Sequence, residues 1–174
     1  VYKECKLRYE TETFHTFFIK KKNNHLTIKK MSKKLTNQQL IEIANEFGTP
    51  VYIYHAEKIA EQYNKLKKAF KGCDAHFFYA CKSLTNVNVL KYIQSLGASL
   101  DCVSINEVKL GLMAGFDKDN ILFTPNCVDF EEIVDAKELG VHINIDNISI
   151  LEQFGNKFGG SYPVCIRLNP HIMA

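Results

Sequence analysis

Short apolar runs and amphipathic segments alternate regularly along the chain from residue 76 onward. Five strand-like runs start about 21 to 23 residues apart, at His76, Ser99, Asn120, Val141 and Tyr162. Each gap holds a segment with apolar residues at helical spacing, and three of these segments close on a glycine, at Gly97, Gly115 and Gly140. Strands that alternate with helices at this pitch predict βα units and a parallel sheet, with such apolar strands covered on both faces.

The even pitch favours a barrel over an open doubly wound sheet. No GxGxxG or GxxxxGK[ST] sequence follows any of the five runs, so the usual phosphate-binding signatures of open sheets are missing. Five strands are visible where a closed barrel needs eight, and the sequence stops at RLNPHIMA directly after the fifth. We therefore predict a parallel (β/α)8 TIM-type barrel that is truncated after about five strands.

Two pairs of residues predict how helices of the repeat begin. Ser104 with Glu107, and Asp129 with Glu132, have the spacing of capping boxes, in which each side chain satisfies a free backbone N–H of the other residue.

Two helices and a strand are also predicted before the repeats. The segment TNQQLIEIANEFGTP, with Thr36 and Gln39 in capping-box spacing, predicts a helix that ends at Gly48. VYIY at 51–54 predicts a strand. The next segment predicts a helix closed by Gly72, because its apolar residues share one face: Ile59, Tyr63, Leu66 and Phe70.

Residues 1–30 differ in character from the rest of the chain. They show no clear period and hold eight Lys or Arg and three Glu, a net charge of +5, whereas the other 144 residues hold 14 basic and 16 acidic groups, a net charge of −2. We expect 1–30 to be a basic leader, either a disordered arm or not native, with the true start at Met31. Residues 31–174 would then form the N-terminal part of the barrel domain.

Composition and charge exclude some classes of protein. With 46% hydrophobic and 24% charged residues, the chain is ordinary for a globular protein, and no apolar run reaches the roughly 18 to 20 residues that span a bilayer. The net charge of +3 arises in the leader, whereas nucleic-acid readers carry a basic stripe on the folded domain. We expect neither a nucleic-acid partner nor a membrane.

The six cysteines predict no metal site, because they form no CxxC pair and no zinc-type spacing with histidine. Cys81, Cys102 and Cys165 lie inside apolar runs and are expected to be buried thiols, which suits a reducing cytoplasm.

Polar residues interrupt the apolar runs at their carboxyl ends. In a barrel these ends share one rim, where active sites lie. The residues concerned are Lys82, Asp101, Ser104, Asn126, Asp146, Arg167 and Asn169. Buried charges are rarely kept unless they are paired or used, so this rim is the candidate site.

Lys82 is the sharpest candidate. Strand alternation would put Lys82 on one face with Phe78 and Ala80, opposite Tyr79 and Cys81. A lysine amine in the barrel mouth loses water, which frees its lone pair for attack on a carbonyl group. The alternative is a structural lysine that extends from a strand end to water.

Three further charged residues have two interpretations each. Asp101 could steady a protonated amine or pair with a neighbouring lysine. Glu107 could serve the site or only close the capping box. Arg167 could bind an anionic oxygen, or form a buried ion pair with Asp101 or Asp146.

Several ordered motifs resemble the fold-type III pyridoxal-phosphate decarboxylases, and most closely the diaminopimelate decarboxylases. They are FYACKSLTN, LGASLDCVSINEV, AGF followed by ILFTPN, INIDN and CIRLNPHIMA, and they run from about residue 35 to the end. The resemblance implies that the cofactor is pyridoxal 5'-phosphate, that Lys82 binds its aldehyde, that Asp101 and Glu107 lie near the lysine and bind the cofactor, and that Arg167 lies beside the ring.

The resemblance also implies a substrate and an assembly. The expected reaction is decarboxylation of meso-2,6-diaminopimelate to L-lysine by the intact protein, a cytoplasmic homodimer. Parts of the family's site, and its C-terminal β-domain, come later than residue 174, so we expect this chain alone to be inactive. Alternatives are an ornithine, arginine or carboxynorspermidine decarboxylase, a racemase of similar barrel, which matches less well, or a non-catalytic pyridoxal-phosphate carrier.

Overall fold

The computed structural model describes residues 8–9, 12–13, 16–18 and 35–168. The chain divides into two compact units, Val1–Lys71 and Gly72–Ala174. Cys5, Asn169 and most of the predicted leader lie outside the described residues.

The first unit contains short strands and two helices. Strands β1 (Arg8–Tyr9) and β2 (Glu12–Thr13) pair antiparallel, and β3 (Thr16–Phe18) pairs in parallel with β4 (Tyr52–Tyr54). Three of these strands fall within residues 1–30, and the boundary between leader and barrel stays a prediction.

Both predicted helices of the first unit are present, and the predicted end is met only in the first of them. Helix α1 (Asn37–Phe47) opens with the predicted capping box of Thr36 and Gln39. Helix α2 (Ala56–Ala69) has its C-cap at Phe70, two residues before the predicted Gly72, and the His55 side chain caps its first turn.

The second unit is built on a parallel sheet whose strands follow in sequence order. Its strands are β5 (Phe78–Ala80), β6 (Ser99–Cys102), β7 (Ile121–Phe123), β8 (His142–Ile145) and β9 (Cys165–Ile166), each parallel to the next. A doubly wound sheet reverses its strand order part-way, whereas a barrel adds each strand on the same side. The order therefore confirms the barrel-type α/β prediction.

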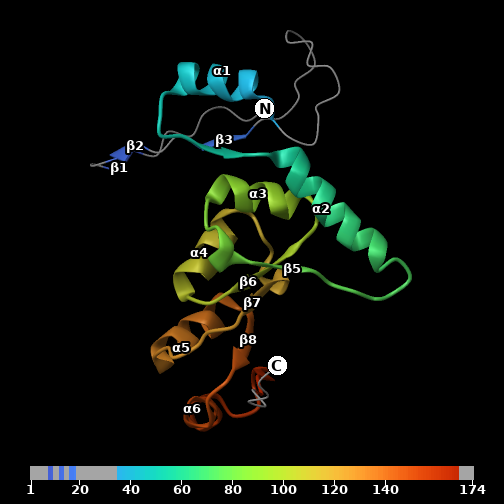
Figure 1. Cartoon of the computed structure of the whole chain (residues 1–174). Coiled ribbons are helices and arrows are strands. Elements are labelled where there is room, and N and C mark those ends of the chain that lie inside the picture. Colours follow the sequence, from blue (N-terminus) through green and yellow to red (C-terminus); the bar gives the residue numbers. More distant parts are fainter. Residues whose placement is uncertain (1–7, 10–11, 14–15, 19–34, 169–174) are drawn as a thin grey trace. The chain divides into compact units, whose positions relative to one another are not determined.

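Helices follow the strands along one side of this sheet (Figure 1). They are α3 (Val87–Ser95), α4 (Ile105–Met113), α5 (Phe130–Leu139) and α6 (Ile148–Phe158), with single 3-10 turns at η1 (Cys81–Ser83) and η2 (Lys118–Asn120). The sheet face under the helices is fully buried, as at Leu100 and Phe123. The opposite face is half-buried, as at Asp101 and Leu122, so among the described residues the predicted cover of both faces is complete only on the helix side.

Helix α4 lies unusually close to the sheet at Gly111. A Cβ atom there would come within 2.5 Å of Leu100 Cδ2 and 3.3 Å of Ile121 Cδ1. Any larger residue at this position would require the Leu100 side chain to shift, and the contact shows that Leu100 and Ile121 point toward the helices.

One predicted capping box is half formed and the other is wrong. The Ser104 hydroxyl accepts the Glu107 N–H at 3.3 Å, but the Glu107 carboxylate accepts the Val103 N–H at 2.8 Å, one residue earlier than a capping box requires. Asp129 makes no side-chain cap. The Glu132 carboxylate instead accepts the Ile105 N–H at 3.2 Å, so it caps the neighbouring helix α4.

This cap between helices predicts a stability effect. Glu132→Ala removes an acceptor at the positive end of α4, and we expect the free energy of unfolding to fall by about 1 kcal/mol. Glu131→Ala is the matched control, because Glu131 is exposed on the same turn and makes no such bond. Urea denaturation followed by circular dichroism measures both, and equal effects of the two substitutions would contradict the cap.

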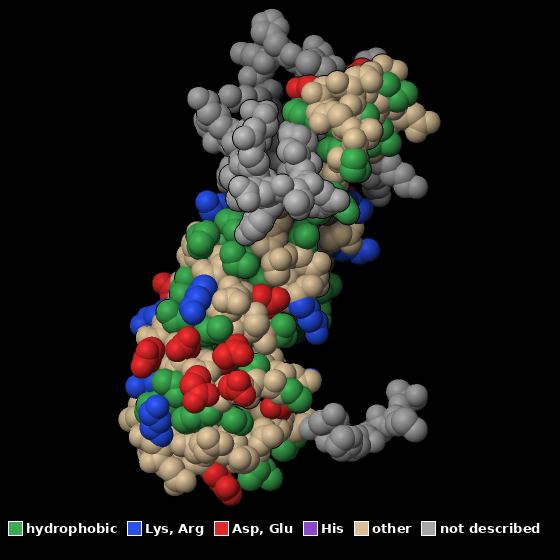
Figure 2. Space-filling view, turned by 90° about the vertical axis from the view of Figure 1, so that its left-hand side faces the viewer, with side chains coloured by type: hydrophobic (Ala, Val, Ile, Leu, Met, Phe, Trp, Pro, Cys, Tyr) green, Lys and Arg blue, Asp and Glu red, His purple; other side chains and the backbone are tan. Residues whose placement is uncertain are grey.

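Acidic side chains gather on the face turned to the viewer in Figure 2. Helix α5 alone carries four, and one of them, Asp135, pairs with Lys109 of α4 at 3.7 Å. This face therefore presents no basic stripe of the kind that binds nucleic acid. Among the described residues, no helix has the length and apolar character needed to cross a bilayer.

Candidate active site

Lys82 lies at the carboxyl end of β5, but not on the strand itself. The strand ends at Ala80, and Lys82 is the middle residue of the 3-10 turn η1. The prediction that Lys82 shares a strand face with Phe78 and Ala80 is therefore wrong, since a 3-10 turn does not alternate its side chains between two faces. The Lys82 side chain is exposed, and no described acidic group forms an ion pair with it.

Asp101 lies on the neighbouring strand at the same height. The register pairs Asp101 with Ala80, two residues before Lys82. Leu100 and Cys102 are fully buried on the helix side, so Asp101 points to the opposite face, where it is half-buried. The predicted alternative of an ion pair with a neighbouring lysine is not found among the described residues.

Glu107 lies on the helix side of the sheet and not on the Asp101 face. Its side chain is 9% exposed, and its carboxylate is bound to the Val103 N–H, just after β6. Among the residues that the structure describes, no Lys, Arg or His forms an ion pair with Glu107. In this position the carboxylate stabilises the turn that follows Asp101.

Arg167 is separated from Lys82 by the width of the sheet. It follows β9, four strands along from β5, and its N–H donates to the Ile145 carbonyl at 2.9 Å. Its side chain is exposed, and it pairs with neither Asp101 nor Asp146 in the described part of the chain. The predicted alternative of a buried ion pair is therefore wrong here.

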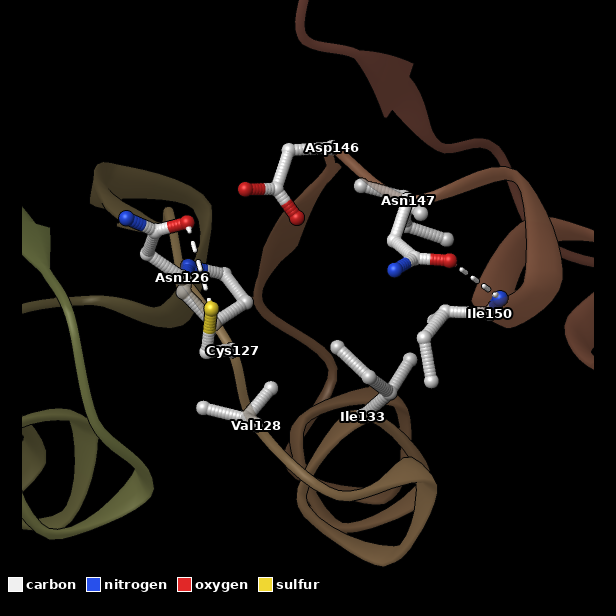
Figure 3. Close-up of a pocket in the computed structure, with 9 residues that line it drawn as sticks. Asn126, Cys127, Val128, Ile133, Asp146, Asn147 and Ile150 are labelled. Carbon is white, nitrogen blue, oxygen red and sulfur yellow. Dashed lines mark hydrogen bonds between the residues drawn. The ribbon is translucent and has the colours of Figure 1, made fainter.

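Two other predicted rim residues do meet. A cavity of about 250 Å³ opens at the carboxyl ends of β7 and β8, and both Asn126 and Asp146 line it (Figure 3). Apolar side chains, among them Ile133 and Ile145, also line it. Cys127, which sequence reasoning did not select, also lines it with a positive φ of 56°. Ser104, in contrast, is the N-cap of α4, where its hydroxyl accepts the Glu107 N–H.

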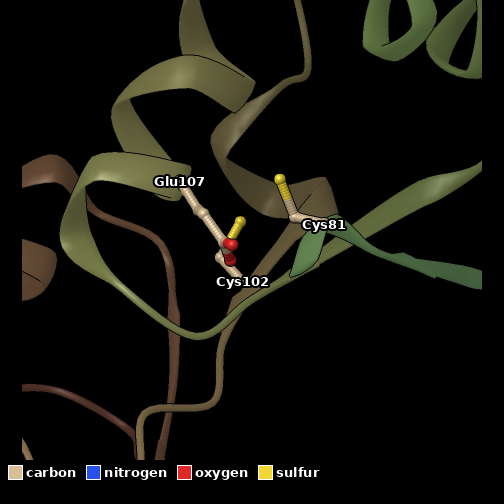
Figure 4. Close-up of side chains that lie close together, drawn as sticks. All are labelled: Cys81, Cys102 and Glu107. Carbon is tan, nitrogen blue, oxygen red and sulfur yellow. The ribbon is translucent and has the colours of Figure 1, made fainter. Parts of the chain in front are cut away.

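A buried cluster that the sequence did not predict lies directly behind the Lys82 turn. The side chains of Cys81, Cys102 and Glu107 converge there, and their ligand atoms all lie within 4.8 Å of one another (Figure 4). The neighbouring Cys102 thiol lowers the pKa of Cys81, and the neighbouring Cys81 sulfur, together with burial, raises the pKa of Cys102. The prediction of buried thiols is confirmed for these two, whereas Cys165 is exposed at β9.

The sequence held one signal for this cluster. Cys81 and Cys102 are 21 residues apart, which is one repeat of the strand pitch, so parallel pairing brings them side by side. A search for metal motifs by local spacing misses such pairs, because the ligands come from neighbouring strands.

A family model and individual relatives of known function point to the same group of proteins. The family model of the pyridoxal-dependent decarboxylase, pyridoxal binding domain, matches residues 56–174. Diaminopimelate decarboxylase of Methanothermobacter thermautotrophicus is 39% identical over 136 residues, which are 77% of this chain and 32% of that protein. The chain thus spans about a third of the length of this curated relative.

Solved structures agree with this assignment. The crystal structure of diaminopimelate decarboxylase from Helicobacter pylori complexed with L-lysine matches with a TM-score of 0.69 and 30% identity, over 76% of this chain and 35% of that one. Lysine/ornithine decarboxylase from Vibrio vulnificus, complexed with putrescine, matches with a TM-score of 0.64 and 29% identity, over 72% and 35%. The chain belongs to the family of pyridoxal-dependent decarboxylases, and residues 56–174 correspond to its pyridoxal-binding domain.

Proposed function

We propose that the intact protein decarboxylates meso-2,6-diaminopimelate to L-lysine with pyridoxal 5'-phosphate held by Lys82. The observation that carries this proposal is the 39% identity to a diaminopimelate decarboxylase over 77% of the chain, a stretch that contains the Lys82 turn. Fold alone would not suffice, because barrels of this type host many reactions.

The residues of the rim suit this cofactor. Lys82 offers a primary amine that is exposed at the carboxyl end of β5 and is not held in an ion pair by any described residue. Such an amine can reach and bind an aldehyde. When bound, pyridoxal phosphate would take up the electron pair left as the Cα–carboxylate bond breaks.

The other predicted residues have separate tasks. Asp101, on the neighbouring strand and away from the helices, would balance the positive charge of a protonated Lys82 amine. Glu107 is a positioning residue in this proposal, because its carboxylate is already bound to the Val103 N–H. Arg167 is exposed at the far side of the sheet from Lys82. Its guanidinium group would be available there to bind an anionic group.

A second candidate function is decarboxylation of another basic amino acid. The structural match to a lysine/ornithine decarboxylase favours it, at 29% identity against 30% for the diaminopimelate enzyme. Ornithine, arginine and carboxynorspermidine are the alternative substrates, and a non-catalytic pyridoxal-phosphate carrier is the alternative outside enzymes. Homodimer formation and a cytoplasmic location are further parts of the proposal.

The deciding experiment uses the intact protein with pyridoxal phosphate. Carbon dioxide release and the amine product are measured with meso-diaminopimelate, ornithine, arginine and carboxynorspermidine as separate substrates. We expect meso-diaminopimelate to give L-lysine with the highest kcat/KM. A preference for another substrate would support the second candidate, and cofactor binding without carbon dioxide release from any of the four would support the carrier. Residues 1–174 alone are expected to be inactive.

A further inference from the structure

The cluster of Cys81, Cys102 and Glu107 has an unusual combination of burial and chemistry. Cys81 and Cys102 are 0% exposed and Glu107 is 9% exposed. A buried carboxylate is normally paired with a cation or bound to a metal. Among the described residues Glu107 has no cationic partner, and its carboxylate accepts a single hydrogen bond, from the Val103 N–H.

The three side chains are already gathered at nearly the spacing of metal ligands. Their sulfur and carboxylate atoms lie within 4.8 Å of one another. In a tetrahedral zinc site with bonds of about 2.3 Å to sulfur, neighbouring ligand atoms are about 3.8 Å apart. Side-chain adjustments of about 1 Å would close this gap, and Figure 4 shows the three side chains close together.

We propose that Cys81, Cys102 and Glu107 form a binding site for a thiophilic divalent cation such as Zn²⁺ or Cd²⁺. Two thiol protons leave when the ion binds. The two thiolates and the carboxylate together offset the charge of the divalent ion, and the cluster keeps the net charge of about −1 that the carboxylate has without the ion. Three protein ligands leave the fourth tetrahedral position for water or another donor. The site shares Glu107 with the cofactor proposal, where Glu107 is a positioning residue, but metal binding by the three side chains does not require the cofactor.

The position of the site gives it a structural consequence. Cys81 and Lys82 are consecutive residues of the turn η1, and Cys102 directly follows Asp101 on β6. An ion bound to both thiolates would join the ends of β5 and β6 from behind. It would therefore restrain the backbone that carries Lys82 on one strand and Asp101 on the next.

The test uses the intact protein, reduced and free of metal, in which Cys5, Cys73, Cys127 and Cys165 are replaced by serine. Cys81 and Cys102 are then the only cysteines left among residues 1–174. Cd²⁺ titration is followed by the ultraviolet sulfur-to-cadmium charge-transfer band. We expect one ion per chain, and an affinity at least about 10-fold lower in each of C81S, C102S and E107Q. E131Q is the matched control, because Glu131 is exposed on α5, and it should leave the affinity unchanged.

A second measurement does not depend on how the variants fold. X-ray absorption of the zinc-loaded serine-background protein should give two sulfur ligands at about 2.3 Å and oxygen at about 2.0 to 2.2 Å. Absence of zinc–sulfur scattering would overturn the proposal. So would an unchanged Cd²⁺ affinity in folded C81S, C102S or E107Q, or a Cys81–Cys102 disulfide found by mass spectrometry in place of bound metal.

Discussion

Lys82→Ala should abolish decarboxylation and specific attachment of pyridoxal phosphate. Lys82 is the exposed amine at the carboxyl end of β5, beside the strand that carries Asp101, and alanine has no atom that can bind the cofactor aldehyde. Loss of a covalent group of this kind lowers kcat by at least about 10³-fold. The measurement is carbon dioxide release by the intact protein, together with borohydride reduction and peptide mapping of the trapped cofactor.

Lys91→Ala is the matched control for this substitution. Lys91 is also an exposed lysine, but it lies on helix α3, away from the strand ends. It should keep full activity, and the trapped cofactor should still map to Lys82. Cofactor label that stays equally strong in Lys82→Ala, or that spreads evenly over the surface lysines of the wild-type protein, would show that Lys82 is a structural lysine.

Phe123→Ala should destabilise the protein by about 3 to 5 kcal/mol, because it empties the space of a fully buried aromatic ring. Phe123 is 0% exposed on β7, the middle strand of the five, and faces the helices as Ile121 does. Chemical denaturation followed by circular dichroism gives the free energy of unfolding. Because this is a large fraction of the stability of a typical domain, the variant should also be more sensitive to proteolysis.

Met113→Ala is the comparison for this core substitution. Met113 is also a large apolar residue but is 66% exposed at the end of α4, so its loss should change the free energy of unfolding by no more than about 0.5 kcal/mol. If Phe123→Ala lowered the free energy of unfolding by no more than Met113→Ala does, the sheet and helices would not pack around Phe123.

Local patterns determined the order and type of most elements. The spacing of apolar residues within a segment reflects which face of a strand or helix is buried, and Thr36 with Gln39 form a cap from neighbours three residues apart. The constant pitch of 21 to 23 residues indicated one repeated βα unit, and the sequential parallel sheet has that organisation. The motif around Lys82 could also be recognised from the sequence, because its residues are consecutive.

Only the tertiary structure decided the contacts between units of the repeat. Glu132 caps a helix that begins 27 residues earlier, and its spacing from Asp129 wrongly suggested a local cap. Lys82 does not follow the strand alternation, because β5 ends at Ala80 and a 3-10 turn begins at Cys81. Cys81 and Cys102 met Glu107 through strand register and the close approach of α4 at Gly111. A periodic pattern records how each residue is buried, but the partner that buries it depends on register and on helix packing, which no single segment specifies.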